Sequence, residues 1–265
     1  MRLLNRSKNG DSLAEGRGRE KREGFFGFIS TIIYALAIAL VIRTVAYEPF
    51  NIPSESMLPT LLVGDYIFVS KFSYGYSRHS VIFSPPLGEG RIFESAPKRG
   101  DVAVFKLPRD NDTDYIKRII GLPGDRIQMR RGVLYLNGKA VKRERIDDFE
   151  YTDQYGNRFA IPRHRERLPN GVEYDTLDLI ENGDIDDTGI YTVPPEHYFA
   201  MGDNRDNSID SRVAMMKQGV GFIPAENLVG RAEILFFSTD CSAALWEIWK
   251  WPQAIRFRRI FRSIE

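Results

Sequence analysis

Two short segments of the chain contain the residue types from which a nucleophile and its base can be built. Ser54 and Ser56 lie two positions apart in "NIPSESMLPTL", residues 51–61, where apolar side chains and prolines surround them. Lys117 lies in "DYIKRII", residues 114–120. A serine hydroxyl is a weak nucleophile and needs a neighbouring group that accepts its proton. The sequence therefore raises the question of which residue acts as the base.

Histidine, the usual base for a serine, is poorly placed here. The chain has three histidines, and they lie in loop-like, charged surroundings such as "PRHRER" around His164. The chain also lacks the G-x-S-x-G motif that presents a serine at a sharp turn. The histidines show no metal-ligand spacing, and the single Cys241 adds nothing to them. We therefore expect no Ser-His-Asp triad, no metal and no cofactor.

Lysine is the other residue that can act as a base for serine. Strand alternation in residues 114–120 puts Tyr115, Lys117 and Ile119 on one face. Burial there would lower the pKa of the amine, and about three units, or roughly 4 kcal/mol, are needed for neutrality near pH 7. Alternation alone favours the other interpretation, a strand lysine whose tip reaches solvent.

Two further segments contain candidate residues. Ser95 to Lys98 matches S-x-x-K, a motif that needs one helical turn, but Pro97 opposes helix at the preceding residue. "GDNRDNSIDSR", residues 202–212, has the Gly, Asp, Asn and Ser content of a tight, hydrogen-bonded loop in which Asp210 and Arg212 can pair. Taken alone, this segment predicts only a structured turn.

One segment is apolar enough to cross a membrane. Residues 25–42 contain no charged side chain, and as a helix they would extend about 27 Å, close to the thickness of the bilayer's hydrocarbon core. A buried core helix and a cleavable signal peptide are the alternatives. The run is long for a signal peptide and Arg43 separates it from the small residues that follow, so we expect a retained anchor.

Charge predicts the orientation of this anchor. Residues 1–24 contain seven lysines and arginines, whereas Arg43 is the only one between the apolar run and Lys71. The positive-inside bias predicts a cytoplasmic, irregular N-terminal tail and export of residues 43–265. No second apolar run of this length follows, so we expect a single pass. The net charge of +1 gives no indication of a nucleic acid partner.

The exported part has the pattern of a mainly β domain. Short runs rich in β-branched and aromatic residues, separated by Gly, Pro, Asn and Asp, predict strands at 65–72, 99–107, 114–120, 125–130 and 132–138, with further strands near residues 198–204 and 229–238. We expect a catalytic domain over 43–240, a long loop or hairpin at 74–98 and an inserted polar lobe over 139–195. Residues 241–265 mix aromatic and basic side chains, which fits either a membrane interface or an ordinary terminal strand.

Four segments together resemble one family. "PSESMLPTL" (53–61), "RGDVAVFK" (99–106), "YIKRIIGLPGD" (115–125) and "GDNRDNSIDSR" (202–212) resemble, in order and spacing, the conserved boxes of bacterial type I signal peptidases. The anchor before the first box fits the same family. The resemblance covers roughly residues 25–240 and implies a coiled antiparallel β-sheet with an inserted β-rich lobe.

The resemblance implies a serine–lysine dyad. Ser56 would be the nucleophile and Lys117 the neutral general base. Ser54 would place its hydroxyl beside the Ser56 N–H in the oxyanion hole, and Ser208 would orient the Lys117 amine by a hydrogen bond. The family's supporting ion pairs would be Asp203 with Arg118 and Asp210 with Arg212. Glu55, between the two serines, would have to point away from Lys117.

The resemblance also implies the substrate and its location. The substrate would be an extended signal peptide of a preprotein with small residues at −1 and −3, bound in shallow pockets lined by Ile52, Pro53, Met57, Leu61, Tyr115 and Ile116. Fourteen residues separate Ile42 from Ser56, so an extended chain reaches at most about 50 Å from the membrane. The implied location is the bacterial inner membrane, with membrane lipids and the Sec or Tat export machinery as partners.

Two rival functions use the same features. A self-cleaving, repressor-type serine–lysine protease would need a DNA-binding domain where this chain has the apolar segment. An inactive membrane-tethered β-domain that serves as an interaction module would not need Ser56, Lys117 and Ser208 together.

Overall fold

The computed structural model describes residues 9–80, 90–152, 156–244 and 246–264, and it describes side chains from residue 27 onward. The chain divides into two compact units, Met1–Arg43 and Thr44–Glu265. The first unit is helical and the second is mainly β, as the sequence predicts.

A long helix, α1 (Asn9–Val45), contains the predicted membrane segment. Its part Gly27–Val45 has a mean hydropathy of 2.2 and contains no buried residue, as expected for a helix whose apolar side chains face lipid. The expectation of an irregular tail is wrong for residues 9–23, which form the first turns of α1. Leu, Ala, Glu, Lys and Arg in that stretch are good helix formers, so a helix started in the apolar run propagates through them. Residues 1–8 lie outside the described residues.

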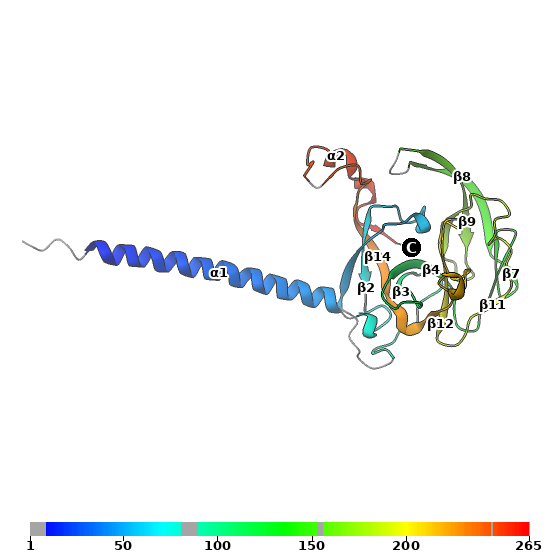
Figure 1. Ribbon diagram of the computed structural model, residues 1–265, viewed down its shortest axis with the longest axis horizontal. Coiled ribbons are helices and arrows are strands. Elements are labelled where there is room, and N and C mark those ends of the chain that lie inside the picture. Colours follow the sequence, from blue (N-terminus) through cyan, green and yellow to red (C-terminus); the bar gives the residue numbers. More distant parts are fainter. Residues whose placement is uncertain (1–8, 81–89, 153–155, 245, 265) are drawn as a thin grey trace, which may run out of the picture. The chain divides into compact units, whose positions relative to one another are not determined.

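The second unit is built on a main antiparallel sheet that curls on itself (Figure 1). Its strands, in spatial order, are β1 (Tyr47–Asn51), β2 (Asp65–Ser70), β14 (Leu228–Ser238), β3 (Val102–Lys106), β4 (Asp114–Gly121), β12 (His197–Met201) and β13 (Ile223–Pro224), with β15 (Arg262–Ser263) paired to β14. Some neighbouring strands, such as β2 and β14 or β4 and β12, come from distant parts of the sequence, and β4 lies between β3 and β12. This order brings the segments that resemble the family boxes together.

Two smaller sheets come from the chain between β4 and β12, which we call the inserted region (residues 126–192). One contains β11 (Tyr191–Thr192), β5 (Arg126–Arg130), β6 (Val133–Leu136) and β7 (Lys139–Ala140); the other contains β10 (Glu173–Leu177), β9 (Arg158–Arg167) and β8 (Lys142–Thr152). The strands that leave the main sheet thus begin at Arg126, earlier than the expected residue 139. Residues 153–155 of this region lie outside the described residues.

Apolar side chains from both sheet systems form continuous cores. Ile120 and Phe199 of the main sheet pack with Ile127 and Leu134 of the inserted region, and all four are almost fully buried. The predicted strands at 65–72, 99–107, 114–120, 125–130 and 132–138 are confirmed as β2 to β6, because their β-branched and aromatic residues fill these cores.

Two peripheral segments have limited regular structure. In residues 74–98, Tyr76 pairs with Ile92, and residues 81–89 lie outside the described part. The C-terminal segment contains a short helix, α2 (Trp251–Ala254), and returns to the main sheet through β15. Its large aromatic side chains face outward, with exposed fractions of 77% for Trp246, 69% for Trp249 and 76% for Phe261.

Candidate active site

Ser56 lies on a tight turn between β1 and β2. Residues Glu55–Met57 form a single 3₁₀ turn, and the Leu61 N–H donates to the Met57 carbonyl at 2.9 Å. The Ile52 N–H donates to the Asp65 carbonyl at 2.8 Å, which ties the start of the turn to β2. Ser56 itself is 7% exposed. The turn therefore holds a serine hydroxyl in a nearly buried position at the end of β1.

Lys117 lies in the middle of the main sheet and faces this turn. It pairs in register with Ala103 of β3, and its side chain is 3% exposed. Its Nζ lies 2.7 Å from Ser56 Oγ and donates to the Ile116 carbonyl oxygen at 2.9 Å. The solvent-reaching lysine that alternation alone favours is therefore wrong, because the turn at Ser56 covers this face of β4.

Burial changes the protonation of this amine. Loss of water around Lys117 lowers its pKa to about 8, against the opposing effects of the carboxylates of Asp210 and Asp203, which raise it. A pKa near 8 leaves about one tenth of the amine neutral at pH 7. The arrangement therefore supplies a base that can accept the Ser56 proton near neutral pH.

Each of the two carboxylates near Lys117 is paired with a buried arginine. The Arg118 guanidinium donates to both oxygens of Asp203, at 2.9 and 2.8 Å, and Arg212 donates to both oxygens of Asp210 at the same distances. These four side chains are at most 4% exposed. Bidentate pairing neutralises both carboxylates, so that their effect on Lys117 stays smaller than the effect of burial.

The other two serines of the expected site are placed differently. Ser54 Oγ lies 3.3 Å from Ser56 Oγ. Ser208 is 8% exposed, and its buried Oγ has no hydrogen-bond partner among the described residues. The expected hydrogen bond from Ser208 to Lys117 is thus not formed in this structure, in which the amine contacts Ser56 and the Ile116 carbonyl.

Gly202 allows the loop that contains Ser208 to approach the serine turn. A Cβ at Gly202 would collide with Ser208 Oγ on one side and lie 2.5 Å from the Ser56 carbonyl oxygen on the other. Next along this loop, the Asn204 N–H donates to the same Ser56 carbonyl at 3.1 Å. The loop therefore contacts the serine turn through backbone atoms, at a point where a side chain does not fit.

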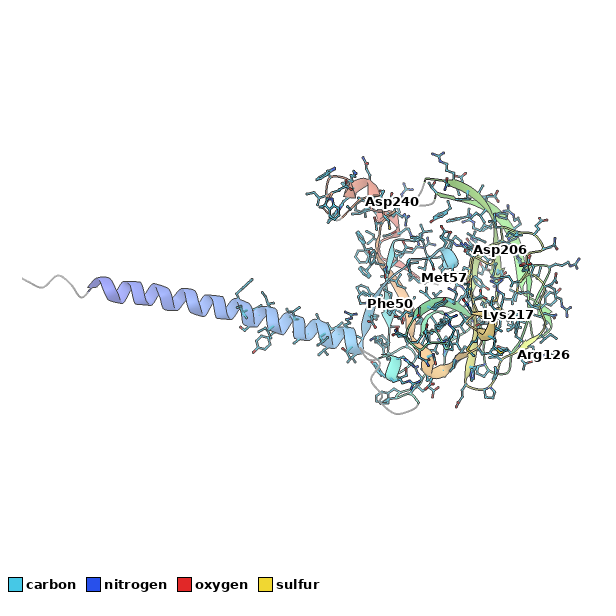
Figure 2. The ribbon with its side chains drawn as sticks, viewed as in Figure 1. Phe50, Met57, Arg126, Asp206, Lys217 and Asp240 are labelled. Atoms are coloured by element: carbon cyan, nitrogen blue, oxygen red, sulfur yellow. The ribbon has the colours of Figure 1, made fainter. Side chains whose placement is uncertain are left out.

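A cavity of about 530 Å³ opens beside the two serines. Of the six expected substrate-binding residues, four line it: Ile52, Pro53, Tyr115 and Ile116. Met57 and Leu61 do not line it, because both are fully buried in the hydrophobic core, and their contact with substrate stays a prediction. Figure 2 shows Met57 inside the body of the domain and Arg126 at its rim.

Sequence reasoning did not identify several residues of the cavity wall: Phe50, Asn51, Val104, Thr113, Asp114, Asn207 and Ile209. Asn207 and Ile209 directly flank Ser208 in the sequence, and this proximity is a signal by which they could have been predicted to line the cavity. Asn207 Nδ2 donates to Glu55 Oε2 at 3.1 Å, which gives this carboxylate a partner other than Lys117. The position of Glu55 thus agrees with the requirement that its carboxylate point away from the Lys117 amine.

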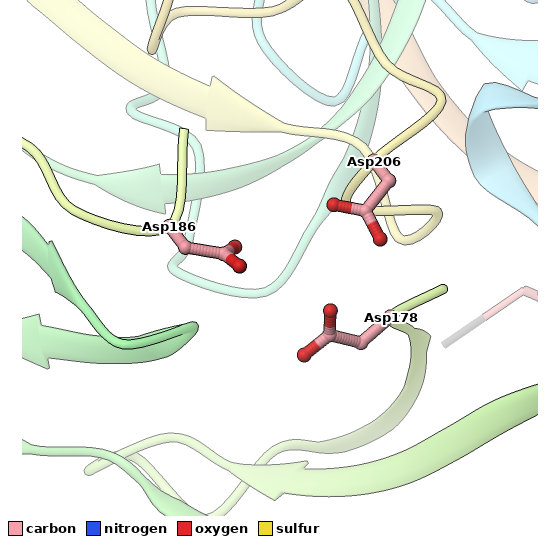
Figure 3. Close-up of side chains that lie close together, drawn as sticks. All are labelled: Asp178, Asp186 and Asp206. Atoms are coloured by element: carbon pink, nitrogen blue, oxygen red, sulfur yellow. The ribbon is translucent and has the colours of Figure 1, made fainter. Parts of the chain in front are cut away.

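Among the described residues, one group of acids is compact enough to hold a metal ion. Carboxylate oxygens of Asp178, Asp186 and Asp206 lie within 4.8 Å of one another (Figure 3). Arg143 pairs with Asp178, and backbone N–H groups donate to the other two, from Gly183 to Asp186 and from Leu179 and Ile180 to Asp206. These bonds explain the cluster as a support for its loops, and we assign it no ligand.

Comparison with known proteins agrees with this geometry. Residues 25–237 match the family described as "Signal peptidase, peptidase S26". Signal peptidase I of Rickettsia typhi is 39% identical over 252 residues, covering 89% of this chain and 92% of that protein, and the Rickettsia prowazekii enzyme is 36% identical over 97% and 98%. A solved signal peptidase I from Enterococcus faecalis is 26% identical, with a TM-score of 0.30 over 52% of this chain and 97% of that one.

These relatives are peptidases, so the repressor-type protease and the inactive interaction module are not supported. The match covers the anchor, the serine turn, β4 and the loop at residues 202–212 in one stretch. The chain therefore belongs to the S26 family of signal peptidases.

Proposed function

We propose that this protein removes N-terminal signal peptides from exported preproteins, with Ser56 as the nucleophile and Lys117 as the general base. The observation that carries the proposal is the 2.7 Å distance between Ser56 Oγ and Lys117 Nζ in a site almost closed to water. That distance allows direct proton transfer, and burial lowers the pKa of Lys117 into the range of a working base.

Acylation uses the neutral amine. Ser56 Oγ attacks the carbonyl carbon of the −1 residue while its proton passes to Lys117 Nζ. The resulting ammonium then protonates the nitrogen of the leaving mature chain as the C–N bond breaks. The product is an ester between Ser56 and the last residue of the signal peptide, and Lys117 is neutral again.

Hydrolysis of this ester repeats the same proton transfers with water. Lys117 takes a proton from a water molecule that attacks the ester carbonyl, and it returns the proton to Ser56 Oγ as the C–O bond breaks. The signal peptide leaves with a new carboxylate, and the enzyme is regenerated.

The remaining hydroxyls support the charges that form during these steps. The Ser56 N–H and the Ser54 hydroxyl stabilise the oxyanion, and one such donor contributes about 3–4 kcal/mol. Ser208 provides a buried hydroxyl without a partner next to Gly202, and we assign it to the additional N–H of the Lys117 ammonium. The pairs of Arg118 with Asp203 and of Arg212 with Asp210 prevent the carboxylates from holding Lys117 protonated.

The substrate lies extended in the cavity beside the serines. Ile52, Pro53, Tyr115 and Ile116 form apolar walls around it, and Phe50 and Val104 extend them. Large side chains that converge on a shallow pocket leave room for alanine and exclude bulkier residues. This wall accounts for a preference for small residues at −1 and −3.

The protein is membrane-anchored, and we propose a single pass of α1 with residues 44–265 on the outer side of the bacterial inner membrane. The cluster of basic residues at 1–24 supports this orientation. Preproteins emerging from the Sec or Tat export machinery are then the substrates. The outward-facing Trp246, Trp249 and Phe261 support contact of the C-terminal segment with membrane lipids.

Removal of either dyad member abolishes cleavage. We expect Ser56→Ala and Lys117→Ala to lower kcat by about 10³-fold or more, because no other group takes over the attack by Ser56 or the proton transfer by Lys117. Lys117→Arg is equally inactive, since a guanidinium stays protonated. The measurement is cleavage of a preprotein with Ala at −1 by detergent-solubilised protein. Ser95→Ala and Lys98→Ala, from the rejected S-x-x-K motif, are matched controls that keep activity. Cleavage by Lys117→Ala would remove the general-base assignment.

The pH dependence follows from the lowered pKa of Lys117. The protonated amine cannot accept the Ser56 proton, so kcat rises about tenfold per pH unit below pH 8 and levels off above it. Steady-state rates between pH 6 and pH 9.5 test this expectation. A rate that stays flat over this range, with the protein folded throughout, would contradict it.

The single cysteine of the chain tests the orientation. Cys241 is exposed in the unit that we place outside. In intact spheroplasts we expect a membrane-impermeant maleimide to label it without permeabilisation. A matched variant with Cys241→Ser and Ser12→Cys should be labelled only after lysis. The reverse pattern would show the opposite orientation.

All three tryptophans of the chain lie in the C-terminal segment, at residues 246, 249 and 251, so their fluorescence reports on it alone. We expect brominated lipids to quench this fluorescence in proteoliposomes, because the bromine atoms lie within the bilayer. A control with all three changed to Phe and with Tyr135→Trp in the inserted region should not be quenched. Equal quenching in both proteins, or none in either, argues against the lipid contact.

A further inference from the structure

The inserted region is joined directly to the loop beside the nucleophile. The Leu177 N–H, at the end of β10, donates to the Asp203 carbonyl, and the Arg205 N–H donates to the Leu177 carbonyl, each at 2.9 Å. Asn204, which lies between Asp203 and Arg205 in the sequence, donates from its N–H to the Ser56 carbonyl and from Nδ2 to the Glu55 carbonyl, both at 3.1 Å. The strand, the loop and the serine turn thus form one chain of hydrogen bonds.

A fully buried polar cluster fixes this connection. Glu166 of β9 accepts two hydrogen bonds from the Arg205 guanidinium, at 3.0 and 2.7 Å, and one from the Tyr174 hydroxyl at 2.8 Å. Glu166, Arg205 and Tyr174 are at most 5% exposed. Arg205 Nε also donates to the Gly202 carbonyl at 3.2 Å. The inserted region therefore contributes the counter-ion of an arginine that belongs to the active-site loop.

The same cluster reaches the strand of the base. The Arg118 guanidinium lies over the ring of Tyr174, at 4.3 Å from its centroid, while it pairs with Asp203. Arg118 directly follows Lys117 on β4. On the other side of the turn, Leu58 packs against Ile161 and Leu177 of the inserted region. Both sides of the Ser56–Lys117 contact are therefore in touch with β9 and β10.

Burial of ions on this scale is a poor source of stability, because the loss of hydration offsets most of the attraction between them. It does restrict the geometry, since a buried guanidinium that loses one partner is left uncompensated. A displacement of about 1 Å between reacting groups costs about 100-fold in rate, so the position of the loop at 202–205 matters at that scale.

We propose that Glu166 and Tyr174 are positioning residues for the peptidase reaction, which hold the loop at 202–205 and Arg118 in the arrangement that keeps Ser56 and Lys117 in contact. The proposal rests on the serine–lysine chemistry proposed above. Neither residue lines the cavity, so their effect falls on the chemical steps and leaves substrate binding unchanged.

Tyr174 also influences the protonation of Lys117 through Arg118. The charged groups that act on Lys117 are Asp203, paired with Arg118, and Asp210, paired with Arg212. When the ring beneath Arg118 is lost, this guanidinium holds Asp203 less firmly. The carboxylate then stabilises the Lys117 ammonium more strongly, which raises the pKa of Lys117 and moves the alkaline rise in kcat to higher pH.

The test compares full-length, detergent-solubilised variants on a preprotein with Ala at −1 and −3. We expect Tyr174→Leu and Glu166→Gln to lower kcat by about tenfold or more, with KM changed by less than about twofold. Tyr174→Phe keeps the ring beneath Arg118, and its kcat falls by no more than about threefold. In Tyr174→Leu the rise of kcat with pH also moves to higher pH.

Two matched controls remove similar contacts elsewhere in the inserted region. Tyr135→Leu removes a ring that lies 4.9 Å from the Arg130 guanidinium, and Glu173→Gln removes a carboxylate from the exposed pair with Arg167. Both should stay within about twofold of the parent in kcat. Thermal unfolding gives the folded fraction of each variant, and rates are normalised to it. If Tyr174→Leu does not fold, Glu166→Gln and Tyr174→Phe decide the outcome by their difference in kcat.

A folded Glu166→Gln or Tyr174→Leu protein with the parent's kcat and pH profile overturns the inference, and so does an equal loss in the two controls. Lys117→Ala separates the two levels of the proposal. If that variant is inactive while the positioning variants are fully active, only this inference fails. If Lys117→Ala cleaves, the underlying chemistry fails instead.

Discussion

The site depends on one constraint, which is that the Lys117 amine must be kept out of water and also away from uncompensated negative charge. Burial lowers its pKa from 10.5 to about 8, a change that corresponds to about 3 kcal/mol of destabilised ammonium. A single free carboxylate nearby would cancel much of this effect. Asp203 and Asp210 are both near, and the two bidentate arginines make their presence compatible with a neutral base. In the proposed mechanism, the buried ion pairs therefore serve the chemistry of the lysine rather than stability.

The same constraint explains why the site uses a curled sheet. Lys117 needs cover on the face of β4 that carries it, and that cover comes from the turn at 55–57, about sixty residues earlier in the sequence. The loop at 202–212 closes the other side, about ninety residues later. Because β12 pairs with β4, the loop that follows β12 starts near Lys117. The turn lies between β1 and β2, which β14 and β3 separate from β4, and the curl of the sheet brings it to the same side chain. Without both the turn at 55–57 and the loop at 202–212, the amine on β4 would be exposed to water.

Sequence patterns predicted the local structure better than its assembly. The anchor and the main strands follow from residues 25–42 and from β-branched alternation, because such patterns depend on neighbours in the chain. Alternation predicts which face of β4 contains Lys117, but it does not show whether that face is covered. The pairing of Ser56 with Lys117 therefore came from family resemblance. The start of the inserted region was placed at residue 139 instead of 126, because β5 to β7 have the pattern of good strands whichever sheet they join. Sequence also does not reveal that the side chains of Met57 and Leu61 pack in the hydrophobic core and leave the cavity wall to other residues.

Gly202 shows how the geometry of the dyad is transmitted across the fold. Because a Cβ there would strike Ser208 and approach the Ser56 carbonyl to 2.5 Å, the loop and the turn meet backbone to backbone at this point, beside the side-chain bonds from Asn204 and Asn207 to Glu55. A close-packed contact of this kind transmits a displacement of the loop to the turn. The position of Ser56 thus depends on residues 202–205 as well as on the bonds that tie its turn to β2. Their other neighbours are Leu177 and the buried carboxylate of Glu166, so the precision of the dyad extends outward into the inserted sheet.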